Sequence, residues 1–218
     1  MNHTELEQKL HWERVFTEEP DLYGTESSAP AQNATEVFKK ENVMRILELG
    51  GGQGRDTLYF AQKGFSVNVL DYAFSGINSI REQANALGLS AQVSATLHDV
   101  RIPLPFENFF FDACYSHMLY CMALTMTELL SLSNEVRRVL KPGGYQIYTV
   151  RNIDDPHYGT GIHRGEGIYE IDGLTVHFFS RETVVQLARG FEIININEFQ
   201  ESELPRKLFQ VTLRKTSR

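Results

Sequence analysis

The feature that most constrains the fold of this chain is the stretch ILELGGGQGRDTLYFA, from Ile46 to Ala61. A continuous apolar run is followed by four glycines within five residues and then by a helical pattern. Glycine has the most backbone freedom to lose on folding, so it suits neither a strand interior nor a helix interior. At the joint, however, glycines allow a tight turn close to a ligand, and the helix amides offer donors. The stretch therefore predicts a strand, a ligand-binding turn and a helix.

Further apolar runs alternate with helical patterns along the chain. The predicted strands are SVNVLD, AQVSATLHD, FFFDACYS and YQIYTV, and the helical patterns begin near Phe74 and Thr125. Thr125 and Glu128 have the spacing of a capping box, and the helical pattern that they open extends to Leu140. Strands that alternate with helices predict an α/β fold with a parallel sheet and helices on both faces. At the end of the chain, FEIININEF and LFQVTLRK alternate in polarity and predict an antiparallel hairpin.

Length and charge limit the class of protein. The chain has 218 residues, 42% of them hydrophobic, which suits one domain with a real core. The net charge of −7 argues against a nucleic-acid partner, since nucleic-acid readers usually present a basic face. We expect no secretory signal and no membrane span. Cys114 and Cys121 lack a CxxC spacing, so we expect reduced thiols, no metal site and a cytoplasmic protein.

The spacing of the glycines distinguishes two kinds of cofactor site. A dinucleotide fold requires GxGxxG, and Arg55 stands where the third glycine of that motif would be. The chain has instead Glu48-x-Gly50-x-Gly52-x-Gly54. The next predicted strand ends on Asp71, where an acid can accept both hydroxyls of a ribose. Asp99 closes the third predicted strand, where it could accept from an adenine amino group.

Together these residues resemble the class I S-adenosylmethionine-dependent methyltransferases. ELGGGQG is similar to the first motif of that family, Asp71 to its second, HDV to its third, and LKPGG to its late motif. The resemblance runs from about Met44 to Val150, and the hairpin extends it. It implies a Rossmann-like, seven-stranded, mostly parallel sheet whose last strand is antiparallel. It also implies S-adenosyl-L-methionine as the cofactor.

The resemblance implies a set of cofactor-binding residues. The glycines would line the methionine and ribose part, Asp71 would bind the ribose, Asp99 and the Val100 amide would hold adenine, and Ser116 would face the methionine moiety. The full set is Glu48, Gly50, Gly51, Gly52, Gly54, Asp71, Tyr72, Asp99, Val100 and Ser116. Asp112 is not followed by the Pro-Pro-Tyr of amino-methylating nucleic-acid enzymes, which disfavours methylation of bases.

Two segments flank or interrupt this pattern. Residues 1–41 are polar with scattered aromatics, and they weakly resemble the lid of the small-molecule and tellurite-resistance-like branch, with Trp12 and residues 21–28 covering the cofactor. Residues 151–179 contain many Gly, His, Tyr and Arg residues without a clear helix. Such a length predicts a functional insertion that covers the substrate site.

Methyl transfer from a sulfonium is an in-line displacement, so alignment and exclusion of water matter most. A general base is needed only if the acceptor arrives protonated, and histidine suits that role near neutral pH. The catalytic candidates are His117, His163 and Arg164, and the substrate-binding candidates are Tyr23, Arg151, His157, Tyr158 and Tyr169. The two arginines favour an acceptor that carries a carboxylate or another anion.

The sequence leaves four functions open. A methyltransferase of a small molecule is favoured over one that acts on a protein or RNA. A nicotinamide oxidoreductase is disfavoured by Arg55, and a cofactor-binding protein without catalysis is the fourth alternative. The sequence does not identify the acceptor, the kind of atom that is methylated or the oligomeric state.

Overall fold

The structure is a computed structural model that describes residues 3–20, 22–201 and 205–216. Asp21, which belongs to the predicted lid, lies outside the described residues. The chain divides into two compact units. The first comprises residues 1–102 and 111–116, and the second comprises residues 103–110 and 117–218.

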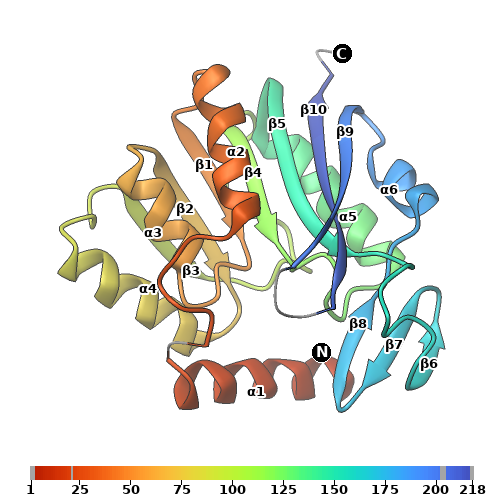
Figure 1. Cartoon of the computed structure of the whole chain (residues 1–218). Coiled ribbons are helices and arrows are strands. Elements are labelled where there is room, and N and C mark those ends of the chain that lie inside the picture. Colours follow the sequence, from red (N-terminus) through yellow and green to blue (C-terminus); the bar gives the residue numbers. More distant parts are fainter. Residues whose placement is uncertain (1–2, 21, 202–204, 217–218) are drawn as a thin grey trace. The chain divides into compact units, whose positions relative to one another are not determined.

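Seven strands form one sheet in the order β3-β2-β1-β4-β5-β10-β9 (Figure 1). Strand β2 pairs in parallel with β1 and β3, and β1 pairs in parallel with β4. Strand β10 is antiparallel to β5 and to β9. The strands are β1 (Arg45–Leu49), β2 (Ser66–Asp71), β3 (Val93–Leu97), β4 (Phe111–His117), β5 (Leu140–Arg151), β9 (Phe191–Gln200) and β10 (Lys207–Lys215). The predicted α/β fold, with a mostly parallel seven-stranded sheet and a final hairpin, is confirmed.

The first unit has its core around β1 and β2. Ile46, Leu47 and Leu49 of β1 are fully buried, as a continuous apolar run predicts for an interior parallel strand. Helices α3 (Arg55–Gln62) and α4 (Phe74–Ala86) follow β1 and β2. Ile77 and Ile80 of α4 pack against Val69 of β2. This core fixes the loops that leave the carboxyl ends of β1 and β2.

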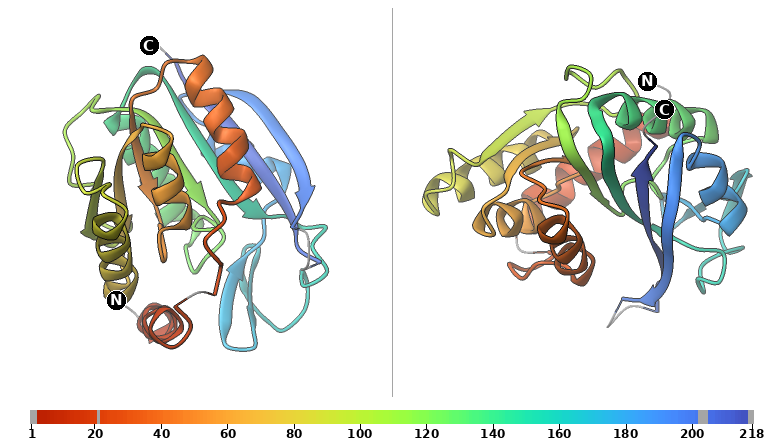
Figure 2. Two further views of the ribbon diagram at one scale, coloured as in Figure 1. Left: turned by 60° about the vertical axis from the view of Figure 1, so that its left-hand side comes forward. Right: turned by 90° about the horizontal axis from the view of Figure 1, so that it is seen from above.

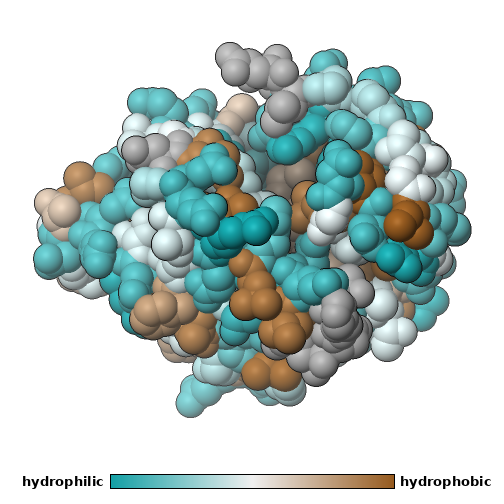
Figure 3. Space-filling view, turned by 90° about the horizontal axis from the view of Figure 1, so that it is seen from below, coloured by the Kyte–Doolittle hydropathy of each residue, from teal (hydrophilic) through white to brown (hydrophobic). Residues whose placement is uncertain are grey.

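The N-terminal segment of the first unit is helical, which the sequence did not predict. Helices α1 (His3–Glu18) and α2 (Ala29–Lys40) account for most of residues 1–41. Ser28 caps α2 by accepting from the amide of Ala31, and Pro30 lies in its first turn. Helix α1 leaves Leu6 and Leu10 half exposed, and Figure 3 shows brown apolar patches on the side of the molecule where α1 lies.

The second unit contains α5 (Met126–Val139), α6 (Arg181–Leu187) and the hairpin of β9 and β10. The predicted capping box at Thr125 and Glu128 is present, with both reciprocal hydrogen bonds. The sequence pattern placed Leu140 on this helix, but Leu140 is extended and begins β5. Strand β5 is therefore longer than YQIYTV and includes the KPGG turn.

The insertion at residues 151–179 forms a small antiparallel sheet of its own. Strands β6 (Ile162–Gly165), β7 (Ile168–Ile171) and β8 (Leu174–His177) pair in that order. Glu166, between β6 and β7, accepts from the amide of Met126 at the start of α5, at 2.9 Å. Nδ1 of the buried His177 lies 2.8 Å from the carbonyl oxygen of Leu124. These two contacts fix the small sheet to the start of α5. Within the described part of the chain, no helix has the length and apolar character needed to cross a membrane.

Candidate functional site

The glycine loop at residues 50–54 joins β1 to α3. Gly50, Gly52 and Gly54 have φ values of 73°, 54° and 96°, which belong to the left-handed region that favours glycine. At Gly51 the reason is different, because a Cβ there would lie 2.3 Å from Cγ2 of Val69. Three glycines therefore permit the turn, and one permits the loop to approach β2.

Asp71 ends β2 and lies beside this loop. Its Oδ2 accepts a hydrogen bond from the Gly52 amide at 2.8 Å, and its Oδ1 accepts from the Ala73 amide at 2.9 Å. Burial raises the pKa of Asp71 to about 6, although the amides of Ala73, Gly52 and Tyr72 favour the ionised form. The result is a buried acid at the carboxyl edge of the sheet, hydrogen-bonded to the loop that the sequence singled out.

Glu48, inside β1, lies behind the loop and is almost fully buried. The Thr57 hydroxyl donates to its carboxyl group. Burial, together with the nearby charge of Asp56, raises the pKa of Glu48 to about 8. Glu48 is therefore protonated at neutral pH and supports the joint between β1 and α3. A direct contact of Glu48 with the cofactor stays a prediction.

The remaining predicted cofactor residues of this unit lie after β3 and at the end of β4. Strand β3 ends at Leu97, two residues before Asp99. Asp99 is paired with Arg101 at 2.9 Å and also accepts from the Arg101 amide at 3.0 Å. The Ser116 hydroxyl donates to the carbonyl of Leu49 at 3.1 Å, so Ser116 and the start of the glycine loop lie together. The roles of Asp99, Val100, Tyr72 and Ser116 toward the cofactor stay predictions.

Helix α1 lies beside the glycine loop and the start of α4 (Figure 2). The Glu13 carboxylate accepts from the amides of Phe74 and Ser75, at 2.6 Å and 3.0 Å. The Phe16 ring lies 3.4 Å from the position that a Cβ on Gly52 would take. The Gln53 side chain donates to the carbonyl of Glu19 at 2.8 Å. Sequence patterns missed Glu13, because its partners are some sixty residues away along the chain.

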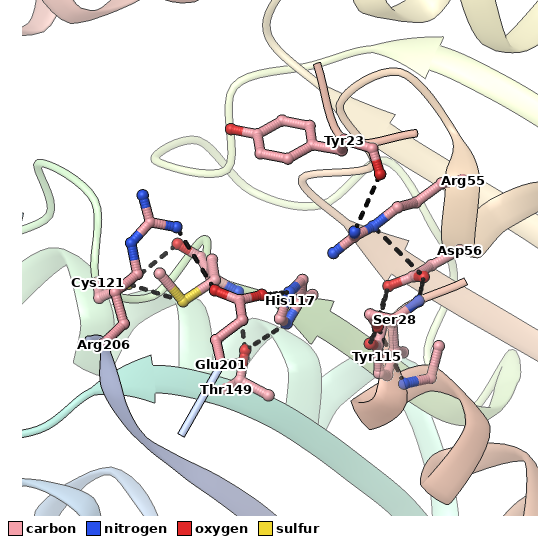
Figure 4. Close-up of polar contacts among 12 residues, drawn as sticks. Tyr23, Ser28, Arg55, Asp56, Tyr115, His117, Cys121, Thr149, Glu201 and Arg206 are labelled. Carbon is pink, nitrogen blue, oxygen red and sulfur yellow. Dashed lines mark hydrogen bonds and ion pairs between the residues drawn. The ribbon is translucent and has the colours of Figure 1, made fainter. Parts of the chain in front are cut away.

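Three buried polar side chains fix the start of α2 to α3 and β4. The Asp56 carboxylate accepts from the amide and the hydroxyl of Ser28, at 2.8 Å and 2.7 Å, and from the Tyr115 hydroxyl at 3.0 Å (Figure 4). Next to it, Arg55 donates to the carbonyl of Tyr23 at 3.3 Å, and its guanidinium lies 5.5 Å from the Tyr23 ring centroid. Tyr23, predicted to bind substrate, is half exposed and contacts Arg55 in this structure.

A second polar group, in the second unit, surrounds His117 at the end of β4 (Figure 4). His117 Nδ1 lies 2.7 Å from the Thr149 hydroxyl, and its Nε2 lies 3.5 Å from Oε1 of Glu201. Arg206 donates to Oε2 of Glu201 at 3.5 Å. Met118, the next residue, has a φ of 65°, and its amide donates to the Thr149 hydroxyl at 3.0 Å. The predicted His117 thus has a carboxylate partner that no sequence motif indicated.

Arg151, at the end of β5, forms a buried ion pair with Asp155. Its Nε and one terminal nitrogen donate to the two carboxylate oxygens at 3.0 Å and 2.6 Å. The same terminal nitrogen lies 2.6 Å from Nδ1 of His157, and the Arg151 guanidinium lies 5.0 Å from the Phe178 ring centroid. Asp155 also accepts from the Lys207 amide at 3.0 Å. This ion pair explains the burial of Arg151, and contacts of Arg151 and His157 with a substrate stay predictions.

Three of the other predicted residues of the insertion contact one another, and the fourth, Arg164, pairs with Glu170. Tyr158 packs edge-on against Tyr169, with ring centroids 5.4 Å apart, and His163 stacks on Tyr169 at 4.8 Å. Arg164 pairs with Glu170 across the β6–β7 ladder. His163 and Arg164 are exposed on β6. The structure therefore brings Tyr158, His163 and Tyr169 together, and the roles of all four residues in catalysis and binding stay predictions.

The fold and the loop together define a class of protein. A mostly parallel sheet with a glycine loop after β1 and a buried acid at the end of β2 is a Rossmann-like fold that binds a nucleotide-containing cofactor. Within that class, residues 46–144 match the family described as "Methyltransferase domain". This match confirms the resemblance to the S-adenosylmethionine-dependent methyltransferases.

Known proteins share parts of the sequence and the fold. Over 111 residues the chain is 35% identical to the fatty-acid O-methyltransferase of Mycolicibacterium smegmatis, an alignment that covers 48% of this chain and 36% of that protein. The 1,6-didemethyltoxoflavin-N1-methyltransferase of Burkholderia thailandensis is 16% identical, with a TM-score of 0.76, over 97% of this chain and 88% of that chain. TehB from Haemophilus influenzae is 19% identical, with a TM-score of 0.68, over 94% and 67%. The two solved structures show that the fold is shared.

Proposed function

We propose that this chain transfers a methyl group from S-adenosyl-L-methionine to a small-molecule acceptor. The observation that carries the proposal is the buried Asp71 carboxylate, hydrogen-bonded to the amide of Gly52 at the carboxyl edge of the sheet. The matched methyltransferase domain spans both residues. The unpaired, buried Cys114 and Cys121 support a reducing, cytoplasmic location.

The residues at this edge fit the chemical groups of the cofactor. The Asp71 carboxylate accepts from the amides of Gly52, Ala73 and Tyr72, and because a carboxylate can accept about four hydrogen bonds, it has capacity left for a ribose hydroxyl. Arg55, the first residue of α3, places a partly exposed cation at a helix N-terminus, which suits the cofactor's carboxylate. The left-handed glycines bring backbone amides close to the ligand.

The chain contributes alignment and exclusion of water. When bound, S-adenosyl-L-methionine supplies a methyl group on a positively charged sulfur, which an acceptor displaces in line. Gly50, Gly52 and Asp71 hold one end of the site, and Ser116 lies beside the start of the loop. Helix α1, through Glu13 and Phe16, covers the loop and keeps water from it. Residues 1–41 thus act as a lid in this proposal.

In this proposal the acceptor binds to residues that follow the carboxyl ends of β4 and β5. His117 follows Ser116 directly, and the insertion at 151–179 leaves the end of β5. Tyr158, His163 and Tyr169 of the insertion form an aromatic cluster that suits contact with a small molecule. Two of the similar proteins are named for small acceptors, a fatty acid and a toxoflavin precursor, which supports this class of substrate.

A matched pair of variants tests the proposal. Asp71→Asn should weaken the binding of S-adenosyl-L-methionine by about 1.5–3 kcal/mol, because hydrogen bonds to a charged acceptor are lost. Asp112→Asn is the control, since Asp112 also accepts two backbone amides, from Met44 and Arg45, at the amino end of β1. Equilibrium dialysis with radiolabelled cofactor compares the two variants with the unchanged protein. Equal affinity in Asp71→Asn and the unchanged protein would remove Asp71 from the site.

A further inference from the structure

The side chains of His117, Glu201 and Arg206 form one cluster in the second unit, which we name the His117 cluster (Figure 4). Glu201 follows the end of β9, and Arg206 precedes β10. The Glu201 carboxylate lies between the two other groups, 3.5 Å from His117 Nε2 and 3.5 Å from an Arg206 nitrogen. The exposed fractions of these side chains are 13% for His117, 29% for Glu201 and 32% for Arg206. The cluster is therefore partly open to solvent.

The hydrogen bonds of Thr149 decide which nitrogen of His117 carries the hydrogen. The Thr149 hydroxyl is fully buried and accepts from the Met118 amide. Its own hydrogen needs an acceptor, because a buried donor without a partner is costly. His117 Nδ1, 2.7 Å away, is that acceptor. The neutral imidazole therefore carries its hydrogen on Nε2, which faces Glu201 in either protonation state of the ring.

His117 is consequently placed as a donor and not as a base. Both of its nitrogens are engaged, Nδ1 by a hydroxyl hydrogen and Nε2 by its own hydrogen toward a carboxylate. Arg206 offers donors to the same carboxylate from the other side. A histidine N–H and a guanidinium that converge on one point make a binding site for a carboxylate. Glu201 is the carboxylate that occupies it in this structure.

The contacts of Glu201 with these two donors are long. Charge-assisted hydrogen bonds to carboxylates are usually about 2.7–2.9 Å, and both contacts here are 3.5 Å. The neighbouring Arg151 holds Asp155 at 2.6 Å, and Arg181 holds Glu198 at 2.7 Å. These two contacts of Glu201 are thus longer than the contacts in two other ion pairs of the same unit. An acceptor carboxylate at the usual distance would form shorter contacts with the same two donors.

We propose that the Glu201 carboxylate stands in for the carboxylate of the methyl acceptor, and that His117 and Arg206 bind that acceptor, a carboxylic acid, when Glu201 is displaced. The proposal rests on the proposed methyltransferase function and names its substrate class. His117 and Arg206 are substrate-binding residues in it, and Glu201 is a competitor built into the chain.

This substrate class explains the absence of a base at the cluster. A carboxylate is already ionised at neutral pH, so no proton has to be removed from it. One of its oxygens forms the new bond to the methyl carbon, and the electron pair of the broken carbon–sulfur bond stays on sulfur. The negative carboxylate and the positive sulfonium become a neutral methyl ester and a neutral thioether.

The proposal is tested by binding of three probes of one chain length, hexanoate, hexan-1-ol and hexylamine. Each is titrated by calorimetry into the full chain with S-adenosylhomocysteine, the demethylated product, present. We expect hexanoate to be the preferred probe. Glu201→Gln, which removes the competing charge, should bind hexanoate at least fivefold more tightly. Arg206→Ala should bind it at least tenfold more weakly. Glu198→Gln is the control, because it removes an exposed ion pair on the same hairpin, and it should stay within twofold.

A second measurement locates the probe without relying on turnover. Hexanoate should shift the imidazole NMR signals of His117 in Glu201→Gln, and those signals are assigned by their loss in His117→Asn. The proposal is overturned if Glu201→Gln binds hexanoate no more tightly than the unchanged protein, if hexylamine is preferred, or if His117 does not respond. Binding of S-adenosylhomocysteine, measured alone, separates this failure from failure of the methyltransferase function.

Discussion

The Asp71 carboxylate and the Gly52 amide are joined by a hydrogen bond of 2.8 Å, so the end of β2 and the glycine loop are held as one piece. A second hydrogen bond, from Ala73 to the other Asp71 oxygen, fixes the carboxylate plane. The acid therefore does not reorganise when it receives further donors. Such preorganisation favours binding, because little ordering cost is left to the ligand.

Affinity for S-adenosyl-L-methionine should depend on pH through Asp71. Burial raises the pKa of Asp71 to about 6, and the ionised form is the one that accepts from ribose hydroxyls. As the pH falls from 7 to 5, Asp71 takes up a proton, and affinity should fall by about tenfold. Asp71→Asn should bind weakly with little pH dependence over this range. Calorimetry at pH 5, 6 and 7 measures the affinity of the unchanged protein and of Asp71→Asn. Parallel pH profiles of the two proteins would contradict the role of Asp71 in binding the ribose.

Glu48 should make the folded state less stable as the pH rises. Its folded pKa is about 8, above the ordinary value of 4.5, because burial disfavours the charge. Its contribution to stability is therefore complete below pH 4.5 and is lost as the pH rises through 8. Glu48→Gln imitates the protonated form, so its free energy of unfolding should exceed that of the unchanged protein by a margin that grows from pH 5 to pH 8.

Urea denaturation at pH 5, 6.5 and 8 provides the measurement. Glu36→Gln is the control, since Glu36 is exposed on α2 and its variant should follow the unchanged protein at each pH. A constant difference between Glu48→Gln and the unchanged protein would show that Glu48 ionises normally in the folded state.

Two tyrosines on buried strands should respond oppositely to loss of the hydroxyl. The Tyr115 hydroxyl donates to Asp56, so Tyr115→Phe should cost about 1–3 kcal/mol of stability. The Tyr148 hydroxyl is buried with no hydrogen-bond partner among the described residues, so Tyr148→Phe should be neutral or stabilising. Thermal denaturation of both variants makes the comparison. A similar loss in both would mean that the Asp56 network contributes nothing specific.

Helix α1 should loosen when Glu13 is removed. The Glu13 carboxylate accepts from two amides at the N-terminus of α4, a position where such a contact is worth about 0.5–2 kcal/mol. Glu13→Ala should increase hydrogen exchange across residues 3–18 and speed release of bound cofactor several-fold. Arg14→Ala, at the exposed neighbouring position, should do neither. Unchanged exchange in Glu13→Ala would remove the lid role of α1.

The parts of the fold that the sequence predicts are those with local signals. The apolar run ending at Leu49, the glycine turn, and the capping box of Thr125 and Glu128 each depend on neighbours in the chain. Helix α1 could not be predicted in this way, because polar residues dominate it and its fixing contact, from Glu13 to α4, is long-range. Strands β6, β7 and β8 have four residues each, which is too short for an alternation of polar and apolar residues to be recognised in the sequence.

The residues of the candidate site also divide into those with a local sequence signal and those without one. Asp71 could be predicted because a strand end and a glycine motif precede it. The partner of His117 could not, since Glu201 lies on a distant hairpin and only the folded chain brings the two within 3.5 Å. The buried ion pair of Arg151 with Asp155 could not be predicted either, although the two residues are close in sequence. Neither the burial of the pair nor its bidentate geometry produces a recognisable sequence pattern.

Calorimetric titration of the unchanged protein with S-adenosyl-L-methionine, and separately with NADH, tests the central claim most directly. We predict a single site with micromolar-order affinity for S-adenosyl-L-methionine, in the usual range for enzyme substrates, and no binding of NADH. Binding of NADH without binding of S-adenosyl-L-methionine would contradict the proposed function.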